Sequence, residues 1–192
     1  MTDFQLARTI AERVHQAGGQ ALFVGGWVRD RLLGRDAKDI DLEVYGSAAD
    51  RLKIQLEECA PVNAVGESFS VYKVGPVDVA LPRTESKSGR GHRGFTVTGD
   101  PYLPFVEAAR RRDFTINAIS WDPLRNEYLD PFHGRSDLER RVLKVVDPTT
   151  FGEDSLRVLR ALQFCARLDL SLDGLTKQIC REIELDDLPA CL

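Results

Sequence analysis

Apolar residues recur along the first part of the chain with spacings that predict alternating helices and strands. Leu6, Ile10 and Val14 return at every fourth position, which is typical of an amphipathic helix, and Gly18-Gly19 provide its stop. Residues 39–45 alternate between apolar and polar side chains, as a half-buried strand does. The predicted elements are helix 3–17, strand 20–24, helix 27–33, strand 39–45 and a helix capped by Ser47 that runs to about Glu58.

The middle and end of the chain continue with short strands and then only helices. The predicted elements are strands 71–74 and 77–81, helix 105–119, a hairpin at 118–130, helix 135–141, strand 142–146 and helices 150–167 and 172–184. Between Arg83 and Leu103 glycines and prolines interrupt every pattern, which predicts a long irregular connection of functional importance. The sequence therefore predicts an α/β (α+β) domain over 1–147, followed by a helical segment over 148–192.

Composition narrows the class of protein. Of the 192 residues, 43% are hydrophobic and 29% charged, which is typical of a soluble globular protein. Asp3 and Arg8 lie where a secretory signal needs apolar residues, and no apolar run is long enough for a membrane span. The four cysteines lack the spacing of a metal site, which favours reduced thiols in a cytoplasmic protein. A net charge of −4 argues against bulk electrostatic coating of nucleic acid, although a local patch is compatible with it.

A first candidate site follows the strand at 20–24. Gly25-Gly26 lead directly into a helix, so backbone N–H groups can approach a phosphate closely, and Arg29 on the first turn can add a charged fork. Taken alone, this pattern is weak evidence and favours a plain tight turn.

The second candidate site is the strand that follows. Asp39 and Asp41 are two residues apart on a predicted strand, so both carboxylates face the same side. Because they repel each other there, the pair favours binding of a hard cation such as Mg²⁺. A phosphate-binding turn followed by such a pair favours metal-dependent phosphoryl or nucleotidyl transfer over a solvated strand face. Asp78, between two valines of a neighbouring strand, is the candidate third carboxylate, and Glu43 is its rival.

Four blocks of the chain resemble the class II tRNA nucleotidyltransferase and poly(A) polymerase family. They occur in the family's order and spacing, and they are GGWVRDRLLGRDAKDIDL at 25–42, RRDFTINAI at 111–119, DPFHGRSDLERRVLKVV at 130–146 and FGEDSLRVLRALQF at 151–164. The resemblance implies a nucleotidyltransferase head of the DNA polymerase beta type with a mixed sheet, followed by a helical neck. It also implies magnesium ions held by Asp39 and Asp41, and a triphosphate held by Gly26 and Arg29.

The resemblance assigns the second block to the incoming nucleotide. Arg111, Arg112 and Asp113, together with Asn117, would contact its ribose and phosphates. From the residues alone, three consecutive arginines at 110–112 suit an anion, and a solvated basic helix start is the alternative.

The fourth block indicates how the base of the nucleotide is recognised. On one helix, Glu153, Arg157, Arg160 and Arg167 share a face, with Asp154 at its edge. A carboxylate accepts a hydrogen bond from an exocyclic amine and a guanidinium donates to the group beside it, which suits cytosine and adenine. The resemblance implies the same: Asp154 and Arg157 select the base, Glu153 positions Arg157, and Arg160 is a further nucleotide-binding residue. An ordinary ion pair three residues apart is the structural alternative.

The expected activity is template-independent transfer of C and/or A from CTP and ATP to the 3′ end of tRNA. An A-adding enzyme or a poly(A) polymerase is the alternative within the family, and a catalytically silent nucleotide- or RNA-binding module is a further one. Gln163 stands where family members commonly carry an arginine, so the resemblance does not imply a triphosphate contact at this position. Residues 81–112 carry seven basic side chains against three acidic ones, in the region of a loop that the family associates with adding the final A.

Overall fold

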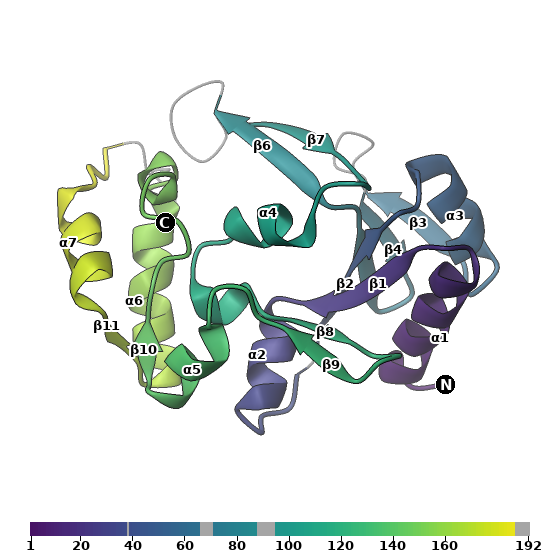
Figure 1. Cartoon of the computed structure of the whole chain (residues 1–192), viewed down its shortest axis with the longest axis horizontal. Helices are drawn as coiled ribbons and strands as arrows, with labels where there is room; N and C mark the ends of the chain where they lie inside the picture. Colours follow the sequence, from purple (N-terminus) through teal and green to yellow (C-terminus); the bar gives the residue numbers. More distant parts are fainter. Residues whose placement is uncertain (38, 66–70, 88–94, 187–192) are drawn as a thin grey trace.

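A computed structural model describes residues 1–37, 39–65, 71–87 and 95–186, and its largest feature is a seven-stranded mixed sheet (Figure 1). The strands lie in the order β3-β4-β5-β2-β1-β8-β9, in which β2 and β5 are parallel and the other neighbours antiparallel. Their bounds are β1 Gln20–Val24, β2 Ile40–Tyr45, β3 Val62–Val65, β4 Val71–Val74, β5 Val77–Ala80, β8 Ser120–Asp122 and β9 Glu127–Leu129. The predicted mixed sheet is confirmed.

Two helices cover one face of this sheet and form the larger core with it (Figure 1). They are α1 Asp3–Gln16 and α3 Ala49–Glu57. The alternation predicted for β2 is confirmed, because Ile40, Leu42 and Val44 are buried in this core. The polar residues between them therefore face the opposite side of the sheet. One face is apolar and covered, which leaves the other to carry polar groups.

A second core occupies the other end of the molecule, where three helices pack around a short two-stranded sheet (Figure 1). The elements there are the 3-10 turn η1 Thr115–Asn117, α5 Gly134–Glu139, β10 Val142–Leu143, the 3-10 turn η2 Phe151–Glu153, α6 Leu156–Leu168, β11 Ser171–Leu172 and α7 Gly174–Glu182. The ring of Phe114 meets those of Phe151 and Phe164 edge-on. This core joins residues from both sides of position 147, and the domain boundary there stays a prediction.

The helix predicted over 105–119 is wrong in its second half. Helix α4 spans only Phe105–Arg110, and the extended residue Phe114 forms an isolated bridge with Val145. Asp113 stabilises the break, because its Oδ1 accepts hydrogen bonds from the backbone N–H of Phe114 (2.8 Å) and from the amide of Asn117 (3.0 Å). Apolar spacing alone does not reveal such a side-chain bond.

The helix predicted over 150–167 also begins later than expected. Asp154 is extended, and its Oδ1 accepts a hydrogen bond from the backbone N–H of Leu156 at 3.1 Å, where α6 starts. Glu153 and Asp154 therefore precede the helix and do not share its face with Arg157. The helical-wheel argument for Glu153 is wrong, although Asp154 remains three residues from Arg157 in the chain.

Further local differences arise where the sequence lacks a clear pattern. The stretch at 83–103 contains an antiparallel hairpin of β6 Arg83–Lys87 and β7 Phe95–Gly99, although it is poor in apolar residues. Strands β3 and β11 were not predicted, the strand expected at 142–146 is limited to β10, and the last helix begins two residues later than expected. Ser47 does not cap α3; its hydroxyl donates to Gln55 Oε1 at 3.3 Å instead.

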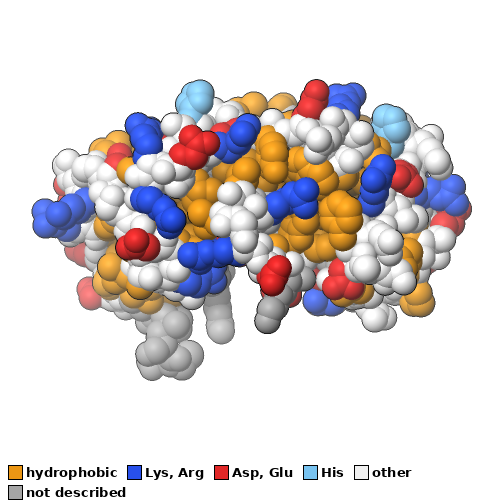
Figure 2. Space-filling model, turned by 90° about the horizontal axis from the view of Figure 1, so that it is seen from below, with side chains coloured by type: hydrophobic (Ala, Val, Ile, Leu, Met, Phe, Trp, Pro, Cys, Tyr) orange, Lys and Arg blue, Asp and Glu red, His pale blue; other side chains and the backbone are white. Residues whose placement is uncertain are grey.

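The lower side of the molecule carries apolar side chains crossed by cationic ones (Figure 2). Figure 2 shows apolar side chains gathered in the middle of this side, with Lys and Arg side chains lying across them. The guanidinium of Arg31, from helix α2 (Gly26–Leu32), lies 5.2 Å from the ring centroid of Trp27 and 4.8 Å from that of Trp121. Within the described ranges, no helix has both the length and the apolar content that crossing a membrane requires.

Candidate functional site

A cleft of about 1010 Å³ opens between the end of β1 and helix α6. It brings together most of the predicted site residues: Gly25, Gly26, Arg29, Asp41, Arg111, Arg112, Asp113, Asn117, Asp154, Arg157 and Arg160. Asp39 lines an adjoining hollow of about 380 Å³ that shares Asp41 and Arg29 with the cleft. Glu153 is half-buried in η2, just before the cleft-lining residues. Of the basic stretch, Arg83 lines the cleft, whereas Arg90 and Arg93 lie outside the described residues.

The turn after β1 requires glycine. Gly25 has φ +66°, a conformation that residues with a Cβ rarely adopt. A Cβ at this position would lie 3.5 Å from Arg112 Nη1 and 3.9 Å from Asp41 Oδ2. The backbone of the turn therefore runs close to both a cationic and an anionic side chain of the cleft.

Two carboxylates face each other across neighbouring strands. Asp41 on β2 lies opposite Asp78 on β5 in the parallel register, and Asp39 precedes Asp41 by two residues. Burial and the nearby Asp78 carboxylate raise the pKa of Asp41. Lys73 Nζ lies 3.0 Å from Asp78 Oδ1 and neutralises part of this charge.

This donor set fits a hard divalent cation, because such an ion relieves the repulsion between facing carboxylates. Among the described residues, no group of three His, Cys, Asp or Glu side chains is arranged to hold a metal ion. The carboxylates nearest to such an arrangement are Asp41 on β2 and Asp78 beside it on β5, with Asp39 immediately before β2.

A chain of hydrogen bonds joins helix α2 to helix α6 beneath the cleft. The buried Arg29 donates through Nη1 to Asn117 Oδ1 at 2.7 Å and also pairs with Asp30. Asn117 donates to Asp113 Oδ1, and Asp113 Oδ2 receives both Nε and Nη2 of Arg160 at 2.7 Å. Asp113 and Asn117 thus fix the positions of two arginines of the cleft, and burial lowers the pKa of Arg29.

Glu43 lies apart from the facing carboxylates and pairs with arginines. It is 3% exposed, and its Oε1 lies 3.3 Å from Arg111 Nη2 and 3.5 Å from Arg112 Nη2. The hydroxyl of Tyr45 donates to Oε2 at 2.6 Å. Burial by itself would raise the pKa of Glu43, but Arg112 and Arg111 outweigh it and hold the pKa below its usual range.

Arg157 is held by two backbone carbonyls that are distant from each other in the chain. Its Nη1 donates to the carbonyl of Thr150 at 3.3 Å, and its Nη2 donates to the carbonyl of Arg111 at 3.1 Å. Asp154 lines the same cleft, at the start of α6. The cleft thus presents a carboxylate from the extended residue Asp154 and a guanidinium from the first turn of α6, and their role as a base-reading pair stays a prediction.

Sequence reasoning missed the central role of Phe164. Its buried ring lies beneath three guanidinium groups: Arg29 and Arg160 at 5.2 Å from the centroid and Arg167 at 5.6 Å. Cation–π attraction helps to hold these like charges together. The available signal was an aromatic residue on α6 flanked by arginines three and four residues away. Gln163, the departure from the family pattern, also lines this cleft.

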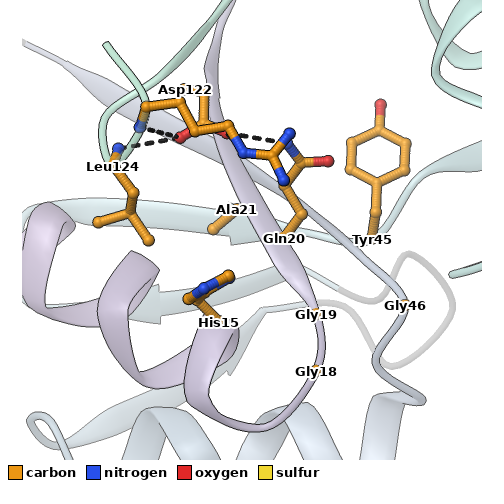
Figure 3. Close-up of a pocket in the computed structure, with 10 residues that line it drawn as sticks. His15, Gly18, Gly19, Gln20, Ala21, Tyr45, Gly46, Asp122 and Leu124 are labelled. Carbon is orange, nitrogen blue, oxygen red and sulfur yellow. Dashed lines mark hydrogen bonds and ion pairs between the residues drawn. The ribbon is translucent and has the colours of Figure 1, made fainter. Parts of the chain in front are cut away.

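A separate cleft of about 520 Å³ lies at the other end of β1, as Figure 3 shows. Hydrogen bonds within the protein engage both oxygens of the buried Asp122 carboxylate. Oδ2 accepts from Gln20 Nε2 at 2.9 Å, and Oδ1 accepts from the backbone N–H groups of Leu124 and Arg125. Because these bonds already satisfy the carboxylate, we place no chemistry there.

The chain matches known proteins along most of its length. Residues 21–144 match the family model described as poly A polymerase head domain. The chain is 46% identical over 175 residues to a multifunctional CCA protein of Stenotrophomonas maltophilia (strain K279a), an alignment that covers 86% of the chain and 41% of that protein. It is also 46% identical over 178 residues to a CCA-adding enzyme of Pseudomonas putida (strain W619), covering 87% and 46%. The chain thus spans less than half the length of these curated relatives.

Solved structures agree with the sequence matches. A CCA-adding enzyme of Bacillus stearothermophilus in complex with CTP superposes with a TM-score of 0.75 at 32% identity, covering 93% of the chain and 43% of that enzyme. A tRNA nucleotidyltransferase complexed with a primer tRNA and an incoming ATP analog gives 0.73 at 32% identity, covering 91% and 49%.

Proposed function

The chain belongs to the poly A polymerase head domain family, and on that premise we propose that it transfers C and A from CTP and ATP to the 3′ end of tRNA. One observation carries the proposal: the glycine turn, Asp41, the arginines and the Asp154–Arg157 pair line a single cleft. The named activities of its relatives support it, and a cytoplasmic location follows as part of the same proposal.

Asp41 in this cleft and Asp39 in the adjoining hollow are the residues that would hold Mg²⁺, with Asp78 as the candidate third carboxylate. These carboxylates would hold Mg²⁺ where it would favour deprotonation of an attacking hydroxyl and offset the negative charge of the phosphates. The fit rests on the repulsion between Asp41 and Asp78, which a cation would relieve.

The chain's own residues orient the triphosphate. The RNA 3′-oxygen attacks the α-phosphate, its bond to phosphorus forms as the bond to pyrophosphate breaks, and pyrophosphate leaves. Gly25 and Gly26 let the phosphates approach the backbone, and Arg29, Arg111 and Arg112 offset their charge. Asp113 and Asn117 keep Arg29 and Arg160 in position.

The base is chosen by Asp154 and Arg157, with Glu153 as a positioning residue for Arg157. Cytosine and adenine each present an exocyclic amine to a carboxylate, whereas uracil and guanine present a carbonyl oxygen there. The two carbonyl contacts that fix Arg157 keep its guanidinium in one orientation. Such a pair discriminates without a nucleic-acid template.

Asp154→Ala is expected to narrow the preference for CTP and ATP over GTP and UTP by about tenfold, since one good base contact contributes about 1–3 kcal/mol of discrimination. Dissociation constants for the four nucleotides, measured by equilibrium titration with Mg²⁺, check this. Asp50→Ala, at an exposed carboxylate on α3, is the matched control. If the selectivity of Asp154→Ala is unchanged, Asp154 does not select the base.

The same titration of the unaltered chain tests the proposed function. CTP and ATP are expected to bind more tightly than GTP and UTP, and the absence of any nucleotide binding by folded chain would refute the proposal. Binding of ATP alone would favour the A-adding or poly(A) polymerase alternative, which the family description itself suggests.

A further inference from the structure

Glu43 on β2 has surroundings unlike those of Asp39 and Asp41, the two acids that precede it at alternate positions. We propose that Glu43 is a positioning residue that fixes Arg111 and Arg112 at the cleft and, through Arg111, links β2 to Arg157. The inference rests on the proposed function, because it assigns a role within the same nucleotide site. It also removes Glu43 from the candidates for the third metal-binding carboxylate.

Both oxygens of the Glu43 carboxylate are already engaged within the chain. Oε1 lies between the guanidinium groups of Arg111 and Arg112, at 3.3 and 3.5 Å, and Oε2 accepts the Tyr45 hydroxyl at 2.6 Å. A carboxylate so deeply buried and so fully paired has little freedom to turn toward a metal ion at Asp41. Its negative charge instead stabilises the guanidinium groups of Arg111 and Arg112.

The two guanidinium groups need this charge to lie close together. Arg111 and Arg112 have side chains only 21% and 19% exposed, so water screens their mutual repulsion weakly. Arg112 also lies against the glycine turn, with Nη1 3.5 Å from the position of a Cβ on Gly25. Glu43 therefore determines where positive charge lies beside the turn proposed to receive the triphosphate.

Arg111 extends this arrangement to the base-reading residue. Its side chain is anchored to β2 through Glu43, and its backbone carbonyl accepts a hydrogen bond from Arg157 Nη2 at 3.1 Å. A shift of Arg111 would thus disturb both the phosphate side and the base side of the cleft. Loss of Glu43 is therefore expected to weaken the binding of CTP and of ATP to a similar extent.

Glu43→Gln keeps the size of the side chain and an acceptor for Tyr45 but removes the charge. The dissociation constants of CTP and ATP are expected to rise about tenfold, because the charge of a buried pair is lost while the partly exposed arginines regain some hydration. The Mg²⁺ concentration that gives half-maximal transfer at saturating nucleotide is expected to stay unchanged. Glu58→Gln, the same substitution in the exposed Arg13–Glu58 ion pair, is the matched control and is expected to match the unaltered chain.

A double-mutant cycle with Arg111→Met supplies the second measurement. The effect of Glu43→Gln on nucleotide affinity is expected to shrink at least threefold when Arg111 is already replaced, because contacting residues act together. Additive effects, an unchanged affinity in Glu43→Gln, or a raised Mg²⁺ requirement would each overturn the positioning role. If the unaltered chain binds no nucleotide, the proposed function fails and this inference fails with it; the other adverse results overturn the inference alone.

Discussion

Asp41→Asn is expected to reduce nucleotide transfer about a thousandfold, the scale on which loss of one charge-stabilising group acts at an active site. Asn offers a neutral oxygen where the proposed divalent ion needs an anionic one. CTP is still expected to bind, because the arginines and α6 remain in place. The thermal midpoint should be no lower than that of the unaltered chain, since replacing Asp41 relieves its repulsion with Asp78.

Transfer rates at saturating CTP, with affinity and thermal unfolding measured in parallel, separate these effects. Asp50→Asn makes the same chemical change on the far side of the sheet and is expected to leave the rate unchanged. Retention of more than about a tenth of the activity in Asp41→Asn would contradict an essential role for this carboxylate in transfer.

Gly134→Ala is expected to produce a large loss of stability for the addition of a single methyl group. A Cβ on Gly134 would overlap the carbonyl oxygen of Thr115 and lie 2.6 Å from its carbonyl carbon, both of them backbone atoms. Relief requires α5 to move away from η1, and this movement would also strain the hydrogen bond from the Thr115 hydroxyl to Asp137. We expect the free energy of unfolding to fall by about 3 kcal/mol. This loss lowers the midpoint of thermal unfolding by about 10 °C.

Gly174→Ala is the control for that measurement, because nothing lies within 4 Å of the added Cβ and the φ of Gly174 is not positive. Its free energy of unfolding is expected to stay within about 1 kcal/mol of that of the unaltered chain. Because η1 carries Asn117, Gly134→Ala is also expected to weaken CTP binding. Equal midpoints for the two variants would contradict the close packing of α5 on η1.

The elements that could be predicted from the sequence are those with a regular apolar pattern. The alternation in β2 fixes which side Ile40 and Leu42 bury, and therefore also the side on which Asp41 lies. The breaks near Asp113 and Asp154 could not be predicted this way, because side-chain to backbone bonds end the regular structure there. Spacing alone also missed β11, which depends on pairing with the distant β10.

The candidate site was predictable as a set of residues but not as a set of contacts. The motifs identify Arg29, Asp113 and Arg160, yet only the fold reveals that Asp113 holds Arg160 and, through Asn117, Arg29. The spacing of β2 groups Glu43 with the aspartates, whereas its distant partners Arg111 and Arg112 follow from the tertiary structure. Residue type and spacing indicate the chemistry of the site. The contacts between distant residues, which determine the role of each side chain, follow only from the tertiary structure.

The central claim, transfer of C and A to tRNA, is tested most directly by following single-nucleotide extension of a tRNA that lacks its 3′ CCA. The chain would be incubated with this tRNA and Mg²⁺, and with CTP, ATP, GTP or UTP alone and with CTP and ATP together. We predict extension by C with CTP, extension that includes A when both CTP and ATP are present, no extension with GTP or UTP, and loss of all products on chelation of the metal. Folded chain that binds CTP but extends the tRNA under none of these conditions would contradict the claim.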